Sequence, residues 1–84
     1  MTDQIDDILD EIYGERLRQL NKWGEQNHGV ADWILILAEE FGEASKEANE
    51  VRFRSKDPSE YRAELIQVAA VAVAAIEALD RGNT

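Results

Sequence analysis

The chain has 84 residues, with 18 acidic and nine basic side chains, a formal net charge of −9 and no cysteine. A chain of this length is expected to form one domain, residues 1–84, that buries only about 60% of the surface its unfolded form exposes, so a partner subunit is expected to complete its core. The net negative charge argues against binding to nucleic acid or to an anionic membrane surface. The lack of cysteine excludes a disulfide framework and a thiolate metal site.

The longest apolar run, from Val68 to Ile76, is too short to span a bilayer, and the first residues are acidic where a signal peptide is basic. We therefore expect a soluble, cytoplasmic protein. Residues 1–15 contain six acids and no base. A local basic group that could attract an anionic small molecule consists of Arg52, Arg54, Lys56 and Arg62.

Residues 3 to about 22 show the spacing of an amphipathic helix, with apolar side chains recurring every three or four positions. A second helix is predicted from Trp33 to about Val51, with Asp32 as its N-cap. Its apolar positions predict a seam for packing against another helix. The seam consists of Ile34, Leu37, Phe41, Ala44, Ala48 and Val51.

The segment DPSE predicts the start of a third helix, with Asp57 as its cap, Pro58 at its first position and Glu60 as in a capping box. The helix is predicted to end at DRG, with Arg81 in the last turn and Gly82 just beyond it. Its predicted seam consists of Tyr61, Leu65, Val68, Ala72, Ala75 and Leu79. No β-like alternation is present. We therefore predict an all-α fold, an N-terminal helix plus a helical hairpin, with a four-helix-bundle core completed by oligomerisation.

The connection between the first two predicted helices, NKWGEQNHGVA at residues 21–31, differs from a simple linker. It contains Trp23, Gln26 and the only histidine, His28. A bare connector seldom carries such residues, although a surface loop whose Trp23 covers the end of the bundle also accounts for them.

A second stripe of the second helix changes from apolar to acidic along its length: Trp33, Ile36, Glu40, Glu43 and Glu47. The third helix carries a matching stripe: Glu64, Gln67, Val71, Ala74 and Ala78. In an antiparallel hairpin, Glu43 would lie about 12 Å from the turn, and Glu64 and Gln67 about 9 and 13 Å from it, at about 1.5 Å per residue. These polar side chains are therefore predicted to face one another at one level.

Carboxylates gathered in this way resist ionising together. A hard divalent cation removes that cost, and ligation by oxygen alone favours Mg²⁺ or Mn²⁺ over zinc. The alternative is a set of solvated glutamates, with the charge of Lys46 offsetting that of Glu43.

The presence of Gly42 inside a predicted helix also calls for an explanation, because glycine there costs about 0.5–1 kcal/mol relative to alanine. Close approach of another helix or of a ligand would provide one.

The segments EEFGE (Glu39 to Glu43) and ELIQ (Glu64 to Gln67), separated by 20 residues, resemble the EExxE, spacer, ExxD signature of the MazG-like all-α nucleoside triphosphate pyrophosphohydrolases. The preceding RQLNKWGEQNH is similar to the nucleotide-side region of their phage-type and dCTPase-like members. The resemblance covers residues 16 to 80. It implies Mg²⁺-dependent hydrolysis of a (d)NTP to a (d)NMP and pyrophosphate, and assembly into homodimers or homotetramers.

Carried over by position, the resemblance also implies roles for individual residues. The implied metal ligands are Glu40, Glu43, Glu64 and Gln67, and the implied catalytic carboxylates are Glu39, Glu40 and Glu43, with Glu39 orienting or deprotonating water. The implied substrate-binding residues are Trp23, Gln26, His28 and Trp33 at the nucleoside, and Lys56 and Arg62 at the phosphate tail. Gln67 stands where the family pattern has Asp, so one negative charge is absent from the implied site.

The sequence is also compatible with a function that is not enzymatic. The acidic first 15 residues also suit a non-catalytic helical oligomer that acts as a binding module, whose stability would not respond to Mg²⁺. A di-iron carboxylate bundle needs two Glu-x-x-His pairs, and the chain has one histidine, in a loop. Neither a phosphate-binding loop of the Walker type nor an EF-hand loop is present.

Overall fold

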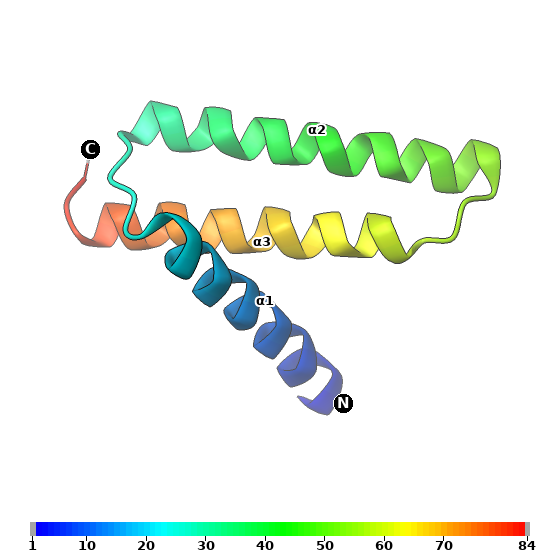
Figure 1. Cartoon of the computed structure of the whole chain (residues 1–84), viewed down its shortest axis with the longest axis horizontal. Helices are drawn as coiled ribbons and strands as arrows, with labels where there is room; N and C mark the ends of the chain where they lie inside the picture. The colour runs from blue at the N-terminus through cyan, green and yellow to red at the C-terminus, as the bar shows by residue number, and fades with distance from the viewer. Residues whose placement is uncertain (1, 84) are drawn as a thin grey trace.

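Three α-helices make up the computed structural model, which describes residues 2–83: α1 (Thr2–Trp23), α2 (Val30–Arg54) and α3 (Ser59–Asp80). No strand occurs within this range, so the prediction of an all-α fold is confirmed. The expected domain, residues 1–84, extends one residue beyond the described range at each end. Figure 1 shows α2 and α3 as an antiparallel hairpin and α1 crossing α3 at an angle.

The start of α2 differs from the prediction. The helix begins at Val30 after Gly29, and no side chain caps it, so Asp32 is not the N-cap but an acid in the first turn. There its carboxylate still lies near the positive end of the helix dipole. The helix also continues past Val51 to Arg54. Its end is set by Ser55, which adopts the left-handed conformation with φ 52°.

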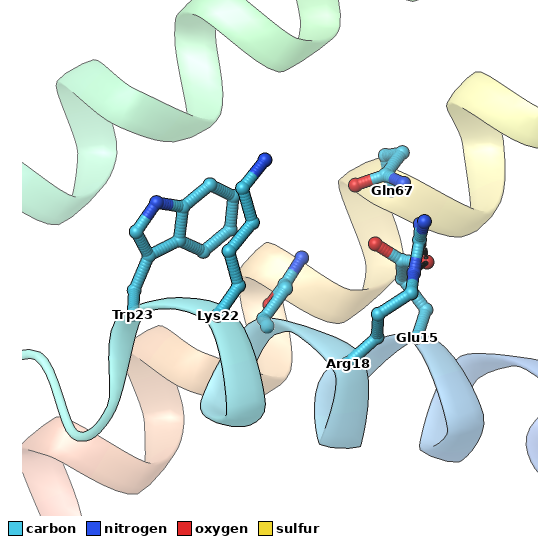
Figure 2. Close-up of a pocket in the computed structure, with 6 residues that line it drawn as sticks. Glu15, Arg18, Lys22, Trp23 and Gln67 are labelled. Carbon is cyan, nitrogen blue, oxygen red and sulfur yellow. Dashed lines mark hydrogen bonds and ion pairs between the residues drawn. The ribbon is translucent and has the colours of Figure 1, made fainter.

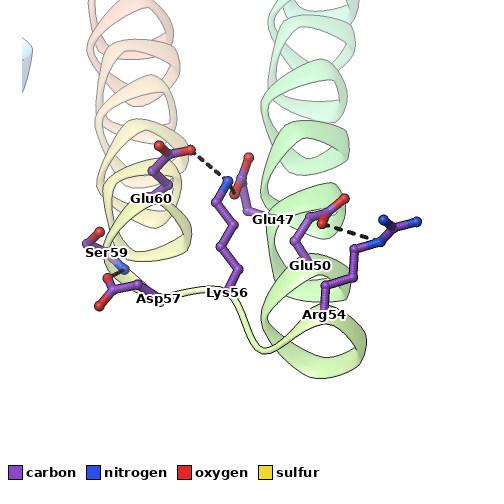
Figure 3. A network of polar contacts seen from close by, with 7 residues as sticks. All are labelled: Glu47, Glu50, Arg54, Lys56, Asp57, Ser59 and Glu60. Atoms are coloured by element: carbon purple, nitrogen blue, oxygen red, sulfur yellow. Dashed lines mark hydrogen bonds and ion pairs between the residues drawn. The ribbon is translucent and has the colours of Figure 1, made fainter.

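The turn before α3 uses the predicted residues in slightly different roles. Pro58 precedes the first helical residue, Ser59, and is not itself helical. Asp57 Oδ1 accepts a hydrogen bond from the Ser59 N–H at 2.8 Å. The Ser59 side chain first, and this N–H second, lower the pKa of the Asp57 carboxyl. Glu60 pairs with Lys56 at 2.9 Å, an ion pair that the capping-box prediction did not include. The polar network of this turn is shown in Figure 3.

The core of the hairpin lies at the end where α2 begins and α3 ends. Its buried members are Trp33, Val71, Ala74 and Ala78, with Ile36, Leu37 and Ala75 packed against them. The four buried residues belong to the second stripes, whereas Leu37 and Ala75 belong to the predicted seams, so the seam prediction is confirmed only in part. Ile34 and Phe41 of that seam are 61% and 65% exposed. Small alanines on α3 accommodate the bulky Trp33 ring, which turns the partly acidic stripe of α2 toward α3.

Helix α1 packs on α3 and makes no close backbone approach to α2 within residues 2–83. A partly buried ion pair holds it there, because Arg16 Nε donates to Glu77 Oε1 at 2.6 Å. Arg62 of α3 also donates two hydrogen bonds to Glu11, at 2.8 and 2.6 Å. Helix α3 therefore contacts both other helices, and Figure 1 shows α2 on one side of α3 and α1 crossing α3 toward the other side. No helix in the described range has the length and apolar character that crossing a membrane requires.

Gly42 has no neighbour in this chain. An added Cβ at this position would meet no atom within 4 Å, so the close approach expected from the sequence does not come from α1 or α3. We expect Gly42→Ala to raise the free energy of unfolding by about 0.5–1 kcal/mol, because alanine is the better helix former. Urea unfolding followed by circular dichroism measures this change. A loss of stability instead would reveal that a second subunit approaches the helix at Gly42.

Candidate functional site

A cleft of about 150 Å³ lies between the end of α1, the first half of α2 and α3. Its lining residues are Gln19, Trp23, Gln26, Trp33, Ile36, Glu40, Gln67 and Val71. The lining combines two indole rings, three amide side chains and one carboxylate from all three helices and the first loop. Five residues implicated by the sequence therefore share one cavity: Trp23, Gln26, Trp33, Glu40 and Gln67.

Carboxylates of α2 and α3 come together beside this cleft. Burial raises the pKa of Glu40, and the nearby charges of Glu64, Glu43, Glu39 and Glu15 raise it further. Burial likewise raises the pKa of Glu64, followed by the charge of Glu43 and then those of Glu47 and Glu60. The level matching of the two helices thus places Glu40, Glu43 and Glu64 within electrostatic reach of one another. Glu39 and Glu43 are exposed, whereas Glu40 and Glu64 are half-buried.

The carboxylates do not form a ready-made metal cage. Among the residues that the structure describes, no three His, Asp or Glu side chains are arranged to hold a metal ion. Mutual repulsion opposes such a gathering while no cation offsets it. The donors nevertheless fit a hard divalent cation, because they are oxygen atoms from two facing helices at one level. The ligand set Glu40, Glu43, Glu64 and Gln67 stays a prediction.

The two tryptophans differ in burial. Trp33 is 5% exposed, and its Nε1 is a buried donor without a hydrogen-bond partner among the described residues. Such unpaired donors are rare in folded proteins and call for an explanation, such as a ligand that supplies the acceptor. Trp23 is 56% exposed, so it borders the cleft and does not cover the end of the bundle.

The loop between α1 and α2 is held by the end of α3. Arg81 donates to the Gln26 carbonyl oxygen at 3.1 Å and to Asn27 Oδ1 at 3.2 Å. This anchoring keeps Gln26 at the cleft. His28 does not line the cleft; its ring packs edge-on against Trp33, with ring centroids 5.0 Å apart. The sequence suggested only a helix-terminal role for Arg81, because its partners lie 54 and 55 residues away.

The two bases expected at the phosphate tail are paired with carboxylates of the chain. Lys56 lies between Glu47 and Glu60, at 2.8 and 2.9 Å, and these hydrogen bonds, Glu47 first, raise its pKa (Figure 3). Arg62 is engaged by Glu11 of α1, which raises the pKa of the guanidinium. Neither side chain lines the cleft, although Arg62 lines a further cavity of about 330 Å³ together with Arg18 and Gln67.

Two other bases lie in a cavity that adjoins the cleft. Arg18 and Lys22 of α1 line an adjoining cavity of about 170 Å³, together with Glu15, Gln19, Trp23 and Gln67 (Figure 2). Three residues, Gln19, Trp23 and Gln67, line both cavities. The spacing of four residues between Arg18 and Lys22 places both on one face of a helix. The sequence shows this spacing. It does not show that α1 crosses α3, and this crossing is what places the face beside the cleft.

Comparisons of the chain with protein-family models, with curated proteins and with solved structures found no significant match.

Proposed function

We propose that the chain is a nucleoside triphosphate pyrophosphohydrolase of the MazG-like type, which uses Mg²⁺, or Mn²⁺ in its place, to cleave a (d)NTP into a (d)NMP and pyrophosphate. The observation that carries the proposal is that Glu40 and Gln67 line the same cleft as Trp23 and Trp33, with Glu64 and Glu43 close enough to raise the pKa of Glu40. An aromatic cavity beside clustered carboxylates suits a ligand with a flat base and a phosphate chain.

The residues divide between binding and chemistry. Indole rings of Trp23 and Trp33 offer stacking surfaces to a base, and the amide of Gln26 offers a donor and an acceptor to its edge. The unpaired Trp33 indole N–H would gain a partner from an acceptor atom on the ligand. His28 supports this wall by packing on Trp33.

The carboxylates would carry the hydrolysis. Glu40, Glu43, Glu64 and the amide oxygen of Gln67 would hold Mg²⁺, which, when bound, supplies charge neutralisation at the phosphate oxygens and makes water more acidic. Glu39 adjoins Glu40 and is exposed, so it would accept the proton of the attacking water. The water oxygen forms a new bond to the α phosphorus. The bond from the α phosphorus to the α,β-bridging oxygen breaks, and that oxygen leaves with pyrophosphate.

Assembly into a homodimer or homotetramer is part of the proposal. Ile34 and Leu79 of the predicted seams are exposed in the single chain and line an apolar groove of about 390 Å³ between α2 and α3. Its lining residues are Val30, Trp33, Ile34, Leu37, Ala75 and Leu79. A second copy that docks the same stripe would bury these side chains and complete a four-helix core, which the thin core of the single chain favours.

A second candidate is the non-catalytic acidic oligomer that binds a partner. It is supported by the start of α1, whose aspartates are exposed and which extends away from the hairpin (Figure 1). The two candidates differ in their response to metal, because only the hydrolase uses its central carboxylates to hold a cation.

The deciding experiment incubates the protein with each common NTP and dNTP, with and without Mg²⁺ or Mn²⁺, and follows the release of nucleoside monophosphate and pyrophosphate. We expect metal-dependent pyrophosphate release that Glu43→Gln lowers strongly, because a carboxylate of the metal site is lost. Release of orthophosphate would contradict the proposed bond cleavage. Absence of turnover with every nucleotide would favour the binding module.

A further inference from the structure

We propose that Arg18 and Lys22 of α1, and not Lys56 and Arg62, bind the phosphate chain of the substrate. The inference rests on the proposed function, because it assigns the phosphate subsite of that same cleft. It gives a role to two residues of the segment RQLNKWGEQNH, for which the resemblance to the pyrophosphohydrolases implied no phosphate contact.

The position of the two cations carries the assignment. The cavity that they line with Glu15 continues from the cleft through Gln19, Trp23 and Gln67, which border both. Figure 2 shows the two side chains on α1, with Trp23 beside them and Gln67 of α3 across from them. A ligand whose base lies between the tryptophans can therefore extend its phosphates past Gln67 toward Arg18.

The electrostatics of the cleft call for such cations. A triphosphate carries several negative charges, and it would meet Glu40, Glu64 and Glu15 around the same space. Cations on the opposite border offset this repulsion and attract the ligand from solution. A guanidinium suits phosphate oxygens because its N–H groups form a planar fork, while an ammonium group acts as a compact point charge.

The present partners of the four bases favour Lys22 in particular. Lys22 Nζ lies 4.7 Å from the Trp23 ring centroid and forms no ion pair with another described residue. Arg18 is 69% exposed, and it engages Glu15 of its own helix through two hydrogen bonds, one of them from Nε at 3.0 Å. Lys56 and Arg62 also each engage carboxylates of their own chain through two hydrogen bonds. A phosphate would have to break such pairs at Arg18, Lys56 and Arg62, but not at Lys22.

The test compares steady-state kinetics of Arg18→Gln, Lys22→Gln and the double variant with those of the unchanged protein, at saturating Mg²⁺. We expect KM to rise about tenfold for each substitution, the effect of one charge-assisted hydrogen bond, with kcat changed less than threefold, because binding common to ground and transition states is removed. Arg18→Lys should recover part of the affinity. Arg54→Gln, an exposed base on α2 far along the helix, is the matched control and should leave KM unchanged.

Binding of a non-hydrolysable α,β-methylene nucleotide, followed by the fluorescence of Trp23 and Trp33, gives a second readout that does not depend on turnover. The double variant should bind this analogue about 100-fold more weakly, while its circular dichroism spectrum stays that of the unchanged protein. An unchanged KM in the folded double variant would overturn the assignment, as would a raised KM in Lys56→Gln/Arg62→Gln alone. If the unchanged protein neither binds nor hydrolyses any nucleotide, the proposed function itself fails and the assignment falls with it.

Discussion

Glu64→Gln is expected to lower metal-dependent turnover by about 10²–10³-fold, the size of loss that follows removal of one preorganised charge-stabilising group. The same substitution should raise the free energy of unfolding of the metal-free protein at pH 7. Glu64 is half-buried and faces the charge of Glu43, and glutamine keeps its shape without adding to that repulsion. A variant that is more stable and less active indicates a functional charge, whereas a packing residue would lose both.

The pH dependence of the stability gain follows from the direction of the pKa shifts. Burial and neighbouring carboxylates raise the pKa values of Glu40 and Glu64 in the folded chain above the ordinary value of 4.5. Ionisation therefore costs stability above the folded pKa, and this cost is relieved as the pH falls through it. The gain from Glu64→Gln should be full at neutral pH and should fade as the pH approaches 4.5.

Thermal unfolding with and without Mg²⁺ measures both effects. An ion at about 100 times its Kd stabilises the protein to which it binds by about 2.7 kcal/mol, so the unchanged protein should gain stability with Mg²⁺ and Glu64→Gln should gain little. Glu50→Gln is the matched control, because Glu50 pairs with Arg54 at 3.6 Å and lies outside the cluster. An equal response to Mg²⁺ in all three proteins would contradict a metal site at Glu64.

Local sequence patterns predicted the helices well, because apolar spacing and the DPSE turn act within a few residues. They did not predict which stripe of α2 faces α3. The two neighbouring stripes both begin with apolar residues, at Trp33 and Ile34, and the choice depends on how the Trp33 ring fits the alanines of α3. The sequence placed Ile34 in a seam against another helix, and in the single chain this side chain is exposed.

The part of the candidate site that depends on the fixed rise per residue of a helix was predictable. In an antiparallel hairpin, the distances of Glu40, Glu43 and Glu64 from the turn are enough to predict that they lie near one another. The contribution of α1 was not predictable, because the angle at which it crosses α3 depends on distant contacts such as the ion pair between Arg16 and Glu77. The carboxylate partners of Lys56 and Arg62 were also not predicted, since a long basic side chain can reach several acids of its own chain.

Ile34→Glu is expected to convert the proposed oligomer into a monomer. Ile34 is exposed in the single chain and lines the apolar groove that a second copy would fill. Burial of such a side chain contributes about 1.5–3 kcal/mol, and twofold symmetry applies the loss twice. The dimer Kd should therefore rise by about 10²–10⁴-fold, as sedimentation equilibrium can measure.

Leu35→Glu is the matched control, because Leu35 is equally exposed but lies outside the groove. If it dissociates the oligomer as well as Ile34→Glu does, or if the unchanged protein is a monomer, the groove is not the interface. Activity of the Ile34→Glu monomer then separates two roles of assembly. The cleft residues all come from one chain, so a folded monomer should keep its nucleotide site, and loss of turnover on dissociation would mean that the second subunit supplies part of it.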